Sequence, residues 1–330
     1  MKVSVVVPAR NEENSIAALI EGLLGQTRPP DEIVICDNGS TDGTARVVES
    51  YAGSGAPVRL VRSGPGLPGR GRNVAAAHAA HDWLAFIDAG IRPAPDWLAR
   101  LVERAEDSPE VAVVYGGWEP VTDSFFKECA AIAYVPPPAE FGGAWMRPRS
   151  IASSLMRREV WRRAGGFPEH LRSAEDLLFM NEVERAGWPT AYAPRALVRW
   201  DIQPNLWRTF RRFVAYSRHN IRAGLWRDWQ AAILRRYALL SAAALPAAAL
   251  GPRWLWAVPV LWLLMLAARG AAALRRQRRA FPAGAGRNLR RLCVLVPLIA
   301  ALDAAALAGC LGWLLLDKLN LARRGAAEVA

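Results

Sequence analysis

Short apolar runs alternate with amphipathic stretches through the first 200 residues. Val3–Val7 is rich in β-branched residues, which is typical of a strand buried on both faces of a parallel sheet. Asn11 can cap the helix that follows, whose apolar positions recur at helical spacing: Ile16, Leu19, Ile20, Leu23 and Leu24. The order of strand and helix then repeats, with strands predicted at residues 32–36, 58–61, 83–87 and 111–115 and helices at 41–50, 71–80 and 96–106. This alternation predicts an α/β domain with a mainly parallel sheet flanked by helices.

Polar or glycine-rich segments follow four of these predicted strands. They are Pro8–Arg10, Asp37–Thr44, Gly64–Asn73 and Asp88–Gly90. Sheets of this kind bind ligands at the carboxyl ends of their strands. We therefore expect the four segments to line one crevice.

Long apolar segments occur only after residue 236. Tyr237–Gly251 and Trp254–Leu274 are separated by a Gly-Pro turn, and arginines stand both before the pair and after it. Basic residues stay on the cytoplasmic side of a membrane, so this pattern predicts a hairpin over about 237–274 with both ends cytoplasmic. A buried helical hairpin of a soluble domain is the alternative.

A third apolar stretch covers residues 292–316 and is long enough to span a bilayer. It contains Asp303, and the basic residues Lys318, Arg323 and Arg324 follow it. A single crossing would place those basic residues outside, against the usual charge rule, so spanning and lying in the interface both stay open. We expect a cytosolic domain at 1–225 and a membrane-associated helical region at 226–330.

The charge distribution supports a membrane and argues against nucleic acid. The 330-residue chain has a net charge of +12, but residues 1–200 hold 22 Lys and Arg against 25 Asp and Glu. Residues 201–330 hold 20 against 5, so the positive charge accompanies the apolar segments. The N-terminal apolar run is too short for a signal peptide, which predicts a cytoplasmic catalytic domain. The four cysteines lack paired spacing, which disfavours a disulfide framework and a zinc site.

A glycine motif at residues 64–69 has the spacing GxGxxG. It follows the third predicted strand rather than the first and contains two prolines, whereas a dinucleotide fold places this turn after its first strand. A nicotinamide or flavin enzyme is therefore disfavoured.

Four motifs together resemble family 2 glycosyltransferases with the GT-A fold. Val5–Glu12 and Asp37–Thr44 resemble the donor-binding half of that family. Asp88 stands where the family has its metal-binding Asp-x-Asp motif, and Glu175-Asp176, preceded by Gly165-Gly166-Phe167, resembles its acceptor-side motif. The resemblance covers residues 1–225, and the C-terminal apolar segments resemble membrane-attached members that act on lipid-linked acceptors.

The resemblance implies inverting transfer of a sugar from a nucleoside-diphosphate sugar to a hydroxyl of a lipid-linked or glycan acceptor. Glycolipid or cell-envelope polysaccharide synthesis at the inner or plasma membrane is the expected setting. Carboxylates suit the base and ribose, and arginines suit the diphosphate. The expected donor-binding residues are Pro8, Ala9, Arg10, Glu12, Asp37, Arg70, Arg72, Asn73, Asp88 and Ala89.

Asp176, with Glu175 beside it, is the candidate catalytic base, because inversion needs one group that accepts the acceptor's proton. Asp88 is the candidate ligand of Mg²⁺ or Mn²⁺. Gly90 replaces the second aspartate of the family motif, which leaves metal dependence open. The basic and aromatic residues that follow could bind the acceptor or the diphosphate, or flank the membrane: Trp200, Arg208, Arg211 and Arg212.

Two other functions stay open. Gly90 would fit a catalytically degenerate domain that binds a sugar nucleotide without turnover. A nucleotidyltransferase shares a similar α/β fold, but it usually has a glycine-rich loop after the first strand, where this chain has Pro8-Ala9-Arg10.

Overall fold

The computed structural model of the protein describes residues 1–249, 251 and 256–319. Its contacts divide the chain into two compact units. Unit 1 comprises Met1–Val121 and Pro138–Asp201, and unit 2 comprises Thr122–Pro137 and Ile202–Ala330. This division differs from the expected boundary at residue 225 because two segments before that residue, at 122–137 and 202–225, pack with the C-terminal helices.

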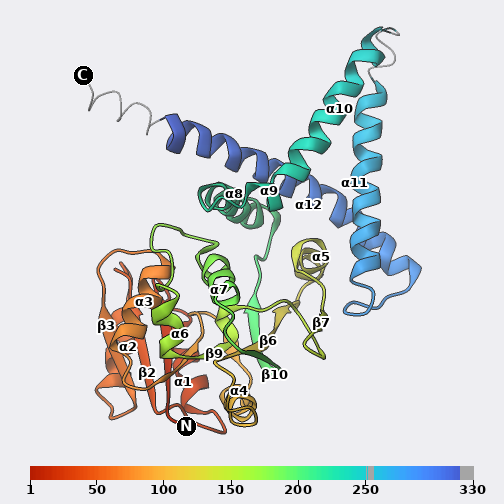
Figure 1. Ribbon diagram of the computed structural model, residues 1–330. Coiled ribbons are helices and arrows are strands. Elements are labelled where there is room, and N and C mark those ends of the chain that lie inside the picture. Colours follow the sequence, from red (N-terminus) through yellow and green to blue (C-terminus); the bar gives the residue numbers. More distant parts are fainter. Residues whose placement is uncertain (250, 252–255, 320–330) are drawn as a thin grey trace, which may run out of the picture. The chain divides into compact units, whose positions relative to one another are not determined.

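Unit 1 is built on an eight-stranded sheet with the order β3-β2-β1-β4-β9-β6-β10-β5 (Figure 1). The strands are β1 Val3–Ala9, β2 Glu32–Asp37, β3 Val58–Arg62, β4 Trp83–Phe86, β5 Arg92–Pro93, β6 Val113–Val121, β9 Ser154–Arg157 and β10 Thr190–Asp201. The neighbours β3-β2-β1-β4 and the pair β6-β10 are parallel. β9 is antiparallel to β4 and β6, and β5 is antiparallel to β10. The sheet is mixed, and most of its pairs are parallel, as expected.

Helices cover both faces of this sheet. They are α1 Ile16–Leu24, α2 Thr44–Ala52, α3 Pro68–His78, α4 Trp97–Glu106, α6 Arg158–Arg163 and α7 Glu175–Arg185. Alternate residues of β1 enter different cores: Val5 packs with α1 and α4, and Val6 packs with α3 and α7. That is why the strand is apolar at nearly every position. A short 3₁₀ turn, Ile151–Ser153, and a hairpin of β7 Ala139–Phe141 and β8 Ala144–Met146 complete the unit.

α2 begins later than predicted and α3 begins earlier, each for a local reason. α2 begins at Thr44 rather than residue 41, because Asp42 accepts hydrogen bonds from Thr44 and Glu13 in the preceding turn. α3 begins at Pro68 rather than residue 71, because proline is well suited to the first helical position. The arginines that follow are thereby fixed on a helix instead of a loop.

Unit 2 is helical. Its helices are α5 Phe125–Tyr134, α8 Leu206–Arg222, α9 Trp226–Trp229, α10 Ala231–Ala249, α11 Ala257–Arg276 and α12 Ala285–Gly312, followed by a π-helical turn at Trp313–Lys318. α10 and α11 are neighbours at the site of the predicted hairpin, and α12 crosses them (Figure 1). Cys129 and Ile132 of α5 share a core with Leu266 of α11 and Leu295 of α12. By length and composition alone, Ala257–Arg276 and Ala285–Lys318 could each cross a membrane.

Candidate active site

Arg72 is the centre of a buried charge cluster at the carboxyl ends of the strands. Its side chain is 4% exposed, and it donates hydrogen bonds of 2.7 Å to Asp88 Oδ1 and 2.7 Å to Glu175 Oε1. The guanidinium also lies over the Phe167 ring, 5.4 Å from its centroid. One cation on α3 therefore joins the end of β4 to the start of α7.

Glycines allow α3 to approach its neighbours closely enough for these contacts. A Cβ at Gly69 would lie 2.4 Å from the carbonyl oxygen of Pro168, and a Cβ at Gly71 would lie 2.2 Å from the Asn38 side chain. Neither distance is sterically possible without movement. The glycines on either side of Arg70 thus fix the position from which Arg72 reaches the two carboxylates.

Glu175 and Asp176 form the first turn of α7. Ala174, directly before them, has the positive φ of +70°. An alanine in this left-handed region is strained, and such strain is common next to functional groups. Glu175 is buried, whereas Asp176 is half-buried and accepts a 2.8 Å hydrogen bond from the backbone N–H of Leu177.

Burial sets the ionisation of the two carboxyl groups. It raises the pKa of Glu175 and of Asp176, and the attraction of the nearby Arg72 guanidinium opposes this in both cases only in part. Burial also acts to lower the pKa of Arg72, but Asp88, Glu175 and Asp176 outweigh it and hold that pKa above its usual value. Arg72 therefore stays a cation, and Asp176 binds its proton more tightly than an exposed aspartate.

The raised pKa of Asp176 predicts how activity falls at low pH if Asp176 is the catalytic base. A base acts only when it is ionised, so activity should fall with decreasing pH at values above about 3.9, the usual aspartate pKa. The measurement is kcat/KM against pH, with circular dichroism at each pH to show that the protein stays folded. A limb at or below the value of an exposed aspartate would contradict the expectation.

The loops after β1 and β2 add further polar groups at this end of the sheet. Asn11 has the positive φ of +58°, and its side-chain oxygen accepts a 2.8 Å hydrogen bond from the Thr41 N–H. Glu12 accepts a hydrogen bond from Ser15, and its Oε2 would lie 3.5 Å from a Cβ at Gly90. Glu12 thus lies beside the turn that follows Asp88.

Asp37 is buried at the end of β2 and accepts a 3.1 Å hydrogen bond from the Ser40 N–H. Arg10 and Arg70 are exposed, and each donates to a carbonyl of the 63–66 loop: Gly66 at 3.2 Å and Ser63 at 3.0 Å. The remaining expected donor-binding positions lie at strand ends: Pro8 and Ala9 are the last residues of β1, and Ala89 follows β4. Apart from Asn73, the expected donor-binding residues come from adjacent strand ends and the start of α3.

Asn73 has a different environment from the one expected for a phosphate ligand. Its amide donates to Phe167 O at 2.9 Å and accepts from Phe167 N at 2.8 Å, so it pairs with both backbone groups of one residue. Its oxygen also accepts from Trp161 Nε1 at 3.1 Å, and a Cβ at Gly166 would lie 2.7 Å from it. Asn73 holds the Gly-Gly-Phe segment against α3, and that segment presents Phe167 to Arg72.

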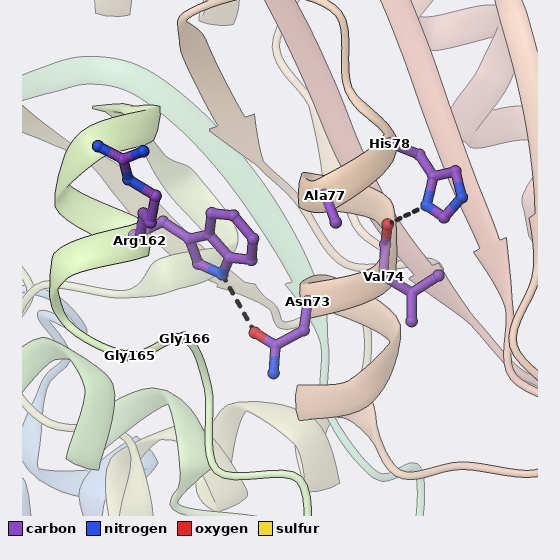
Figure 2. Close-up of a pocket in the computed structure, with 8 residues that line it drawn as sticks. Asn73, Val74, Ala77, His78, Arg162, Gly165 and Gly166 are labelled. Carbon is purple, nitrogen blue, oxygen red and sulfur yellow. Dashed lines mark hydrogen bonds between the residues drawn. The ribbon is translucent and has the colours of Figure 1, made fainter.

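A pocket of about 450 Å³ lies on the other side of this contact (Figure 2). Figure 2 shows Asn73, Ala77 and His78 on one wall and Gly165, Gly166 and Arg162 on the other. Arg72, Asp88, Glu175 and Asp176 do not line this pocket. The charge cluster and this cavity are therefore separate features of unit 1.

The expected acceptor or diphosphate residues are divided between the two units. Trp200 lies on β10 in unit 1, with its ring 5.9 Å from that of Trp118. Arg208, Arg211 and Arg212 lie on α8 in unit 2, where Arg212 donates to the Tyr216 hydroxyl at 2.6 Å. These arginines belong to unit 2, whereas the charge cluster belongs to unit 1.

The sequence prediction missed the link through Arg72 and the strain at Ala174. Arg72 was expected to bind phosphate, but its bonds to residues 88 and 175 connect the donor and acceptor motifs directly. The available signal for these contacts was the position of Arg72, a basic side chain on the apolar face at the start of a helix. No signal in the sequence indicated the positive φ of Ala174.

A sequence model of the glycosyl transferase family 2 matches residues 4–150. Residues 4–150 thus resemble a family 2 glycosyltransferase domain. EpsJ of Bacillus subtilis, an uncharacterised glycosyltransferase, is 28% identical over 56% of this chain and 57% of its own length. The succinoglycan biosynthesis protein ExoA of Rhizobium meliloti is 30% identical over 62% of this chain and 66% of its own length. This chain thus matches only about half to two thirds of these relatives.

Among solved structures, the mannosyltransferase PcManGT of Pyrobaculum calidifontis, in complex with GDP-Man and Mn²⁺, has a similar fold. The TM-score is 0.57 at 23% identity, over 96% of this chain and 88% of that one. The expected GT-A fold is confirmed. The alignment of family 2 includes Arg72 and Asp88 but ends before Glu175 and Asp176.

Proposed function

We propose that the protein is an inverting glycosyltransferase that moves a sugar from a nucleoside-diphosphate sugar to a hydroxyl acceptor. The observation that carries the proposal is the bridge from Asp88 through Arg72 to Glu175. It brings a donor-side carboxylate and an acceptor-side pair of carboxylates to one cation. Two buried polar atoms there, Arg72 Nε and Glu175 Oε2, have no hydrogen-bond partner among the described residues, as expected where a ligand binds.

The donor would bind along the ends of β1, β2 and β4. Glu12 and Asp37 offer carboxylate oxygens to the N–H and hydroxyl groups of a nucleoside. Arg10 and Arg70 are exposed at the 63–66 loop, and their guanidinium groups suit diphosphate oxygens. Arg72 supplies a permanent positive charge beside them as negative charge develops on the leaving nucleoside diphosphate.

Asp176 is proposed as the base. It takes the proton of the acceptor hydroxyl, whose oxygen forms the new bond to the anomeric carbon. The bond from that carbon to the diphosphate oxygen breaks on the opposite face, and the bonding electrons leave with the nucleoside diphosphate. Glu175 Oε1 is held by Arg72 at 2.7 Å, whereas Asp176 Oδ1 accepts its 2.8 Å hydrogen bond from the backbone N–H of Leu177.

A divalent cation fits this site only with help from the donor. No group of three His, Cys, Asp or Glu side chains in the described part of the chain could hold a metal ion. Asp88 is one carboxylate with one oxygen bonded to Arg72, and Gly90 brings none. Mg²⁺ commonly binds one or two carboxylates together with substrate phosphates. Bound in that way at Asp88, it would neutralise diphosphate charge.

The setting is proposed to be glycolipid or cell-envelope polysaccharide synthesis, with the catalytic domain on the cytoplasmic side of the cell membrane. ExoA, named for succinoglycan biosynthesis, supports the polysaccharide class, and the PcManGT complex supports a nucleotide-sugar donor with a divalent cation. The two apolar helices of unit 2 support a membrane location, and the proposed acceptor is lipid-linked or a glycan.

Calorimetry with the full chain tests the donor and the metal together. We expect one of the UDP-, GDP- or dTDP-sugars to bind, and we expect negligible Mg²⁺ or Mn²⁺ binding before the nucleoside diphosphate is present. Clear metal binding should follow once it is added, because most metal ligands then come from the diphosphate and water. Asp88→Ala should abolish this second event.

Asp82→Ala is the matched control, because Asp82 is exposed at the opposite end of the same strand. If no nucleotide sugar binds, the proposed function is wrong. A donor that binds but is never transferred would support a degenerate domain instead. Full transfer in excess EDTA would overturn the metal role and leave Arg70 and Arg72 to neutralise the leaving group.

A further inference from the structure

α12 is held at both of its ends by charged helices of unit 2. Near its start, Arg291 Nε donates to Glu128 of α5 at 2.6 Å, and Arg287 pairs with the same carboxylate. Near the end of the helical stretch, Arg218 of α8 donates two hydrogen bonds of 2.8 Å to Asp317. Ser217 of α8 also donates to Ala306 O at 2.8 Å. α12 is therefore packed against α5 at one end and α8 at the other.

Both of these helices begin at the same end of the same sheet. α5 begins four residues after Val121, the last residue of β6, and α8 begins five residues after Asp201, the last residue of β10. Val121 and Asp201 are paired across the two parallel strands. A residue spans at most about 3.6 Å, so neither helix can start more than roughly 20 Å from that strand end. This distance is less than the thickness of a bilayer, whose hydrocarbon core alone is about 30 Å.

Charge keeps both helices out of the hydrocarbon. α8 carries five arginines over 17 residues: Arg208, Arg211, Arg212, Arg218 and Arg222. α5 carries Lys127 and Glu128. Charged side chains at the centre of a bilayer cost several kcal/mol each, about 2.5–3.5 on insertion scales. α5 and α8 therefore lie on one side of the membrane.

The stretch from Arg287 to Asp317 covers 30 residue steps, or about 45 Å of helix at 1.5 Å per residue. A helix of this length whose two ends contact helices on one side cannot cross a bilayer. We propose that α12 lies along the cytoplasmic face of the membrane, at the boundary of headgroups and acyl chains. In Figure 1, α5 and α8 lie on one side of α12, and the α10–α11 pair extends from the other.

The side chains of α12 form a buried face and an exposed apolar face, as expected of a helix that lies on a membrane surface. Its buried positions face α5, α8 and α11 and include Leu295, Leu298, Ile299 and Gly309. From Leu289 onward, its exposed apolar positions form a stripe within about 80° on the opposite face, at 100° per residue. This stripe consists of Leu289, Cys293, Pro297, Ala304 and Leu311.

The lipid bilayer is the occupant that these features favour. α11 also exposes apolar side chains: Val260, Leu261, Leu263 and Leu264 are each about half exposed or more. Basic residues exceed acidic ones by 20 to 5 in residues 201–330, which suits an anionic cytoplasmic leaflet. The α10–α11 hairpin is the inserted element in this arrangement, and the ion pair of Arg269 with Asp303 lies near the membrane surface rather than at its centre.

The side of the C-terminus tests the proposal in the full chain. An epitope placed after Ala330 should be digested by protease in inside-out membrane vesicles and protected in right-side-out vesicles. An epitope after Arg279 is the internal control, because it is cytoplasmic whether or not α12 crosses. Protection of the C-terminal epitope in inside-out vesicles, with the control digested, would show that α12 spans and would overturn the proposal.

Measurements of immersion depth distinguish a flat α12 from an α12 that crosses the membrane, without reference to the side on which the C-terminus lies. Nitroxide labels are placed singly at residues 289, 293, 304 and 311, in liposomes that contain anionic phosphatidylglycerol. Cys310 is replaced by serine throughout, and Cys293 is replaced by serine in the variants labelled at the other three sites. A flat helix gives similar immersion depths at all four sites. A depth maximum between residues 293 and 304, with both ends in water, means a crossing and contradicts the proposal, as does release of the chain by alkaline carbonate.

Discussion

Asp176→Asn is expected to lower glycosyl transfer by about 10²–10⁴-fold, the usual contribution of a general base, while the donor still binds. The amide keeps the shape of the side chain and can still accept the Leu177 N–H bond at its oxygen. It cannot accept the proton of the acceptor hydroxyl. The loss should therefore appear in kcat, and donor affinity measured by calorimetry should change little.

Glu182→Gln is the control for this variant. Glu182 is on the same helix, and its contact is an ion pair with Arg185 at the surface. Exposed pairs of this kind contribute at most about 1 kcal/mol, so activity should be unchanged. Transfer by Asp176→Asn within threefold of the unmodified protein would remove Asp176 from the role of base and direct attention to Glu175.

Arg72→Ala is expected to affect both stability and donor binding. It leaves Glu175 buried without its cation, and removal of one partner of a buried ion pair typically costs about 3–5 kcal/mol. Chemical denaturation measures this loss. Arg70→Ala, two residues earlier, changes an exposed side chain bonded to one carbonyl and should leave the unfolding free energy nearly unchanged.

A double variant separates folding from function at this position. Arg72→Ala with Glu175→Gln has no buried unpaired carboxylate at residue 175, so part of the lost stability should return. Transfer should stay low, because the positive charge beside the diphosphate is still absent. If the double variant recovers both stability and transfer, Arg72 serves the fold alone.

Local patterns predicted most of unit 1. The apolar runs of β1, β2 and β4 are continuous because each strand is covered on both faces, and this signal depends only on neighbouring residues. The glycines around Arg70 and the motif at Glu175-Asp176 were also visible in the sequence. What these residues contact was not visible, because Arg72 and Glu175 are 103 positions apart.

The domain boundary was harder to predict for the same reason. Residues 122–137 lie between two strands of unit 1, and nothing in their composition separates them from it. Their partners, Leu266, Arg287 and Arg291, are more than 130 residues later in the chain. The sequence could not show what Asn73 contacts, because a polar side chain at a helix start suits a phosphate and a backbone segment equally well.

The distance in sequence between α5 and its partners has a consequence during synthesis. Glu128 and Arg291 are 163 positions apart, and chains grow at about 5–20 residues per second. For roughly 10–30 s after α5 is made, its acidic group lacks its guanidinium partners and Cys129 lacks the apolar cover it has in the folded unit. The sheet of unit 1 can be completed in that interval, since its last strand ends at residue 201. The packing of α5 against α12 is then the last step of folding. A chain truncated before α12 would contain the complete sheet of unit 1 but an incomplete unit 2.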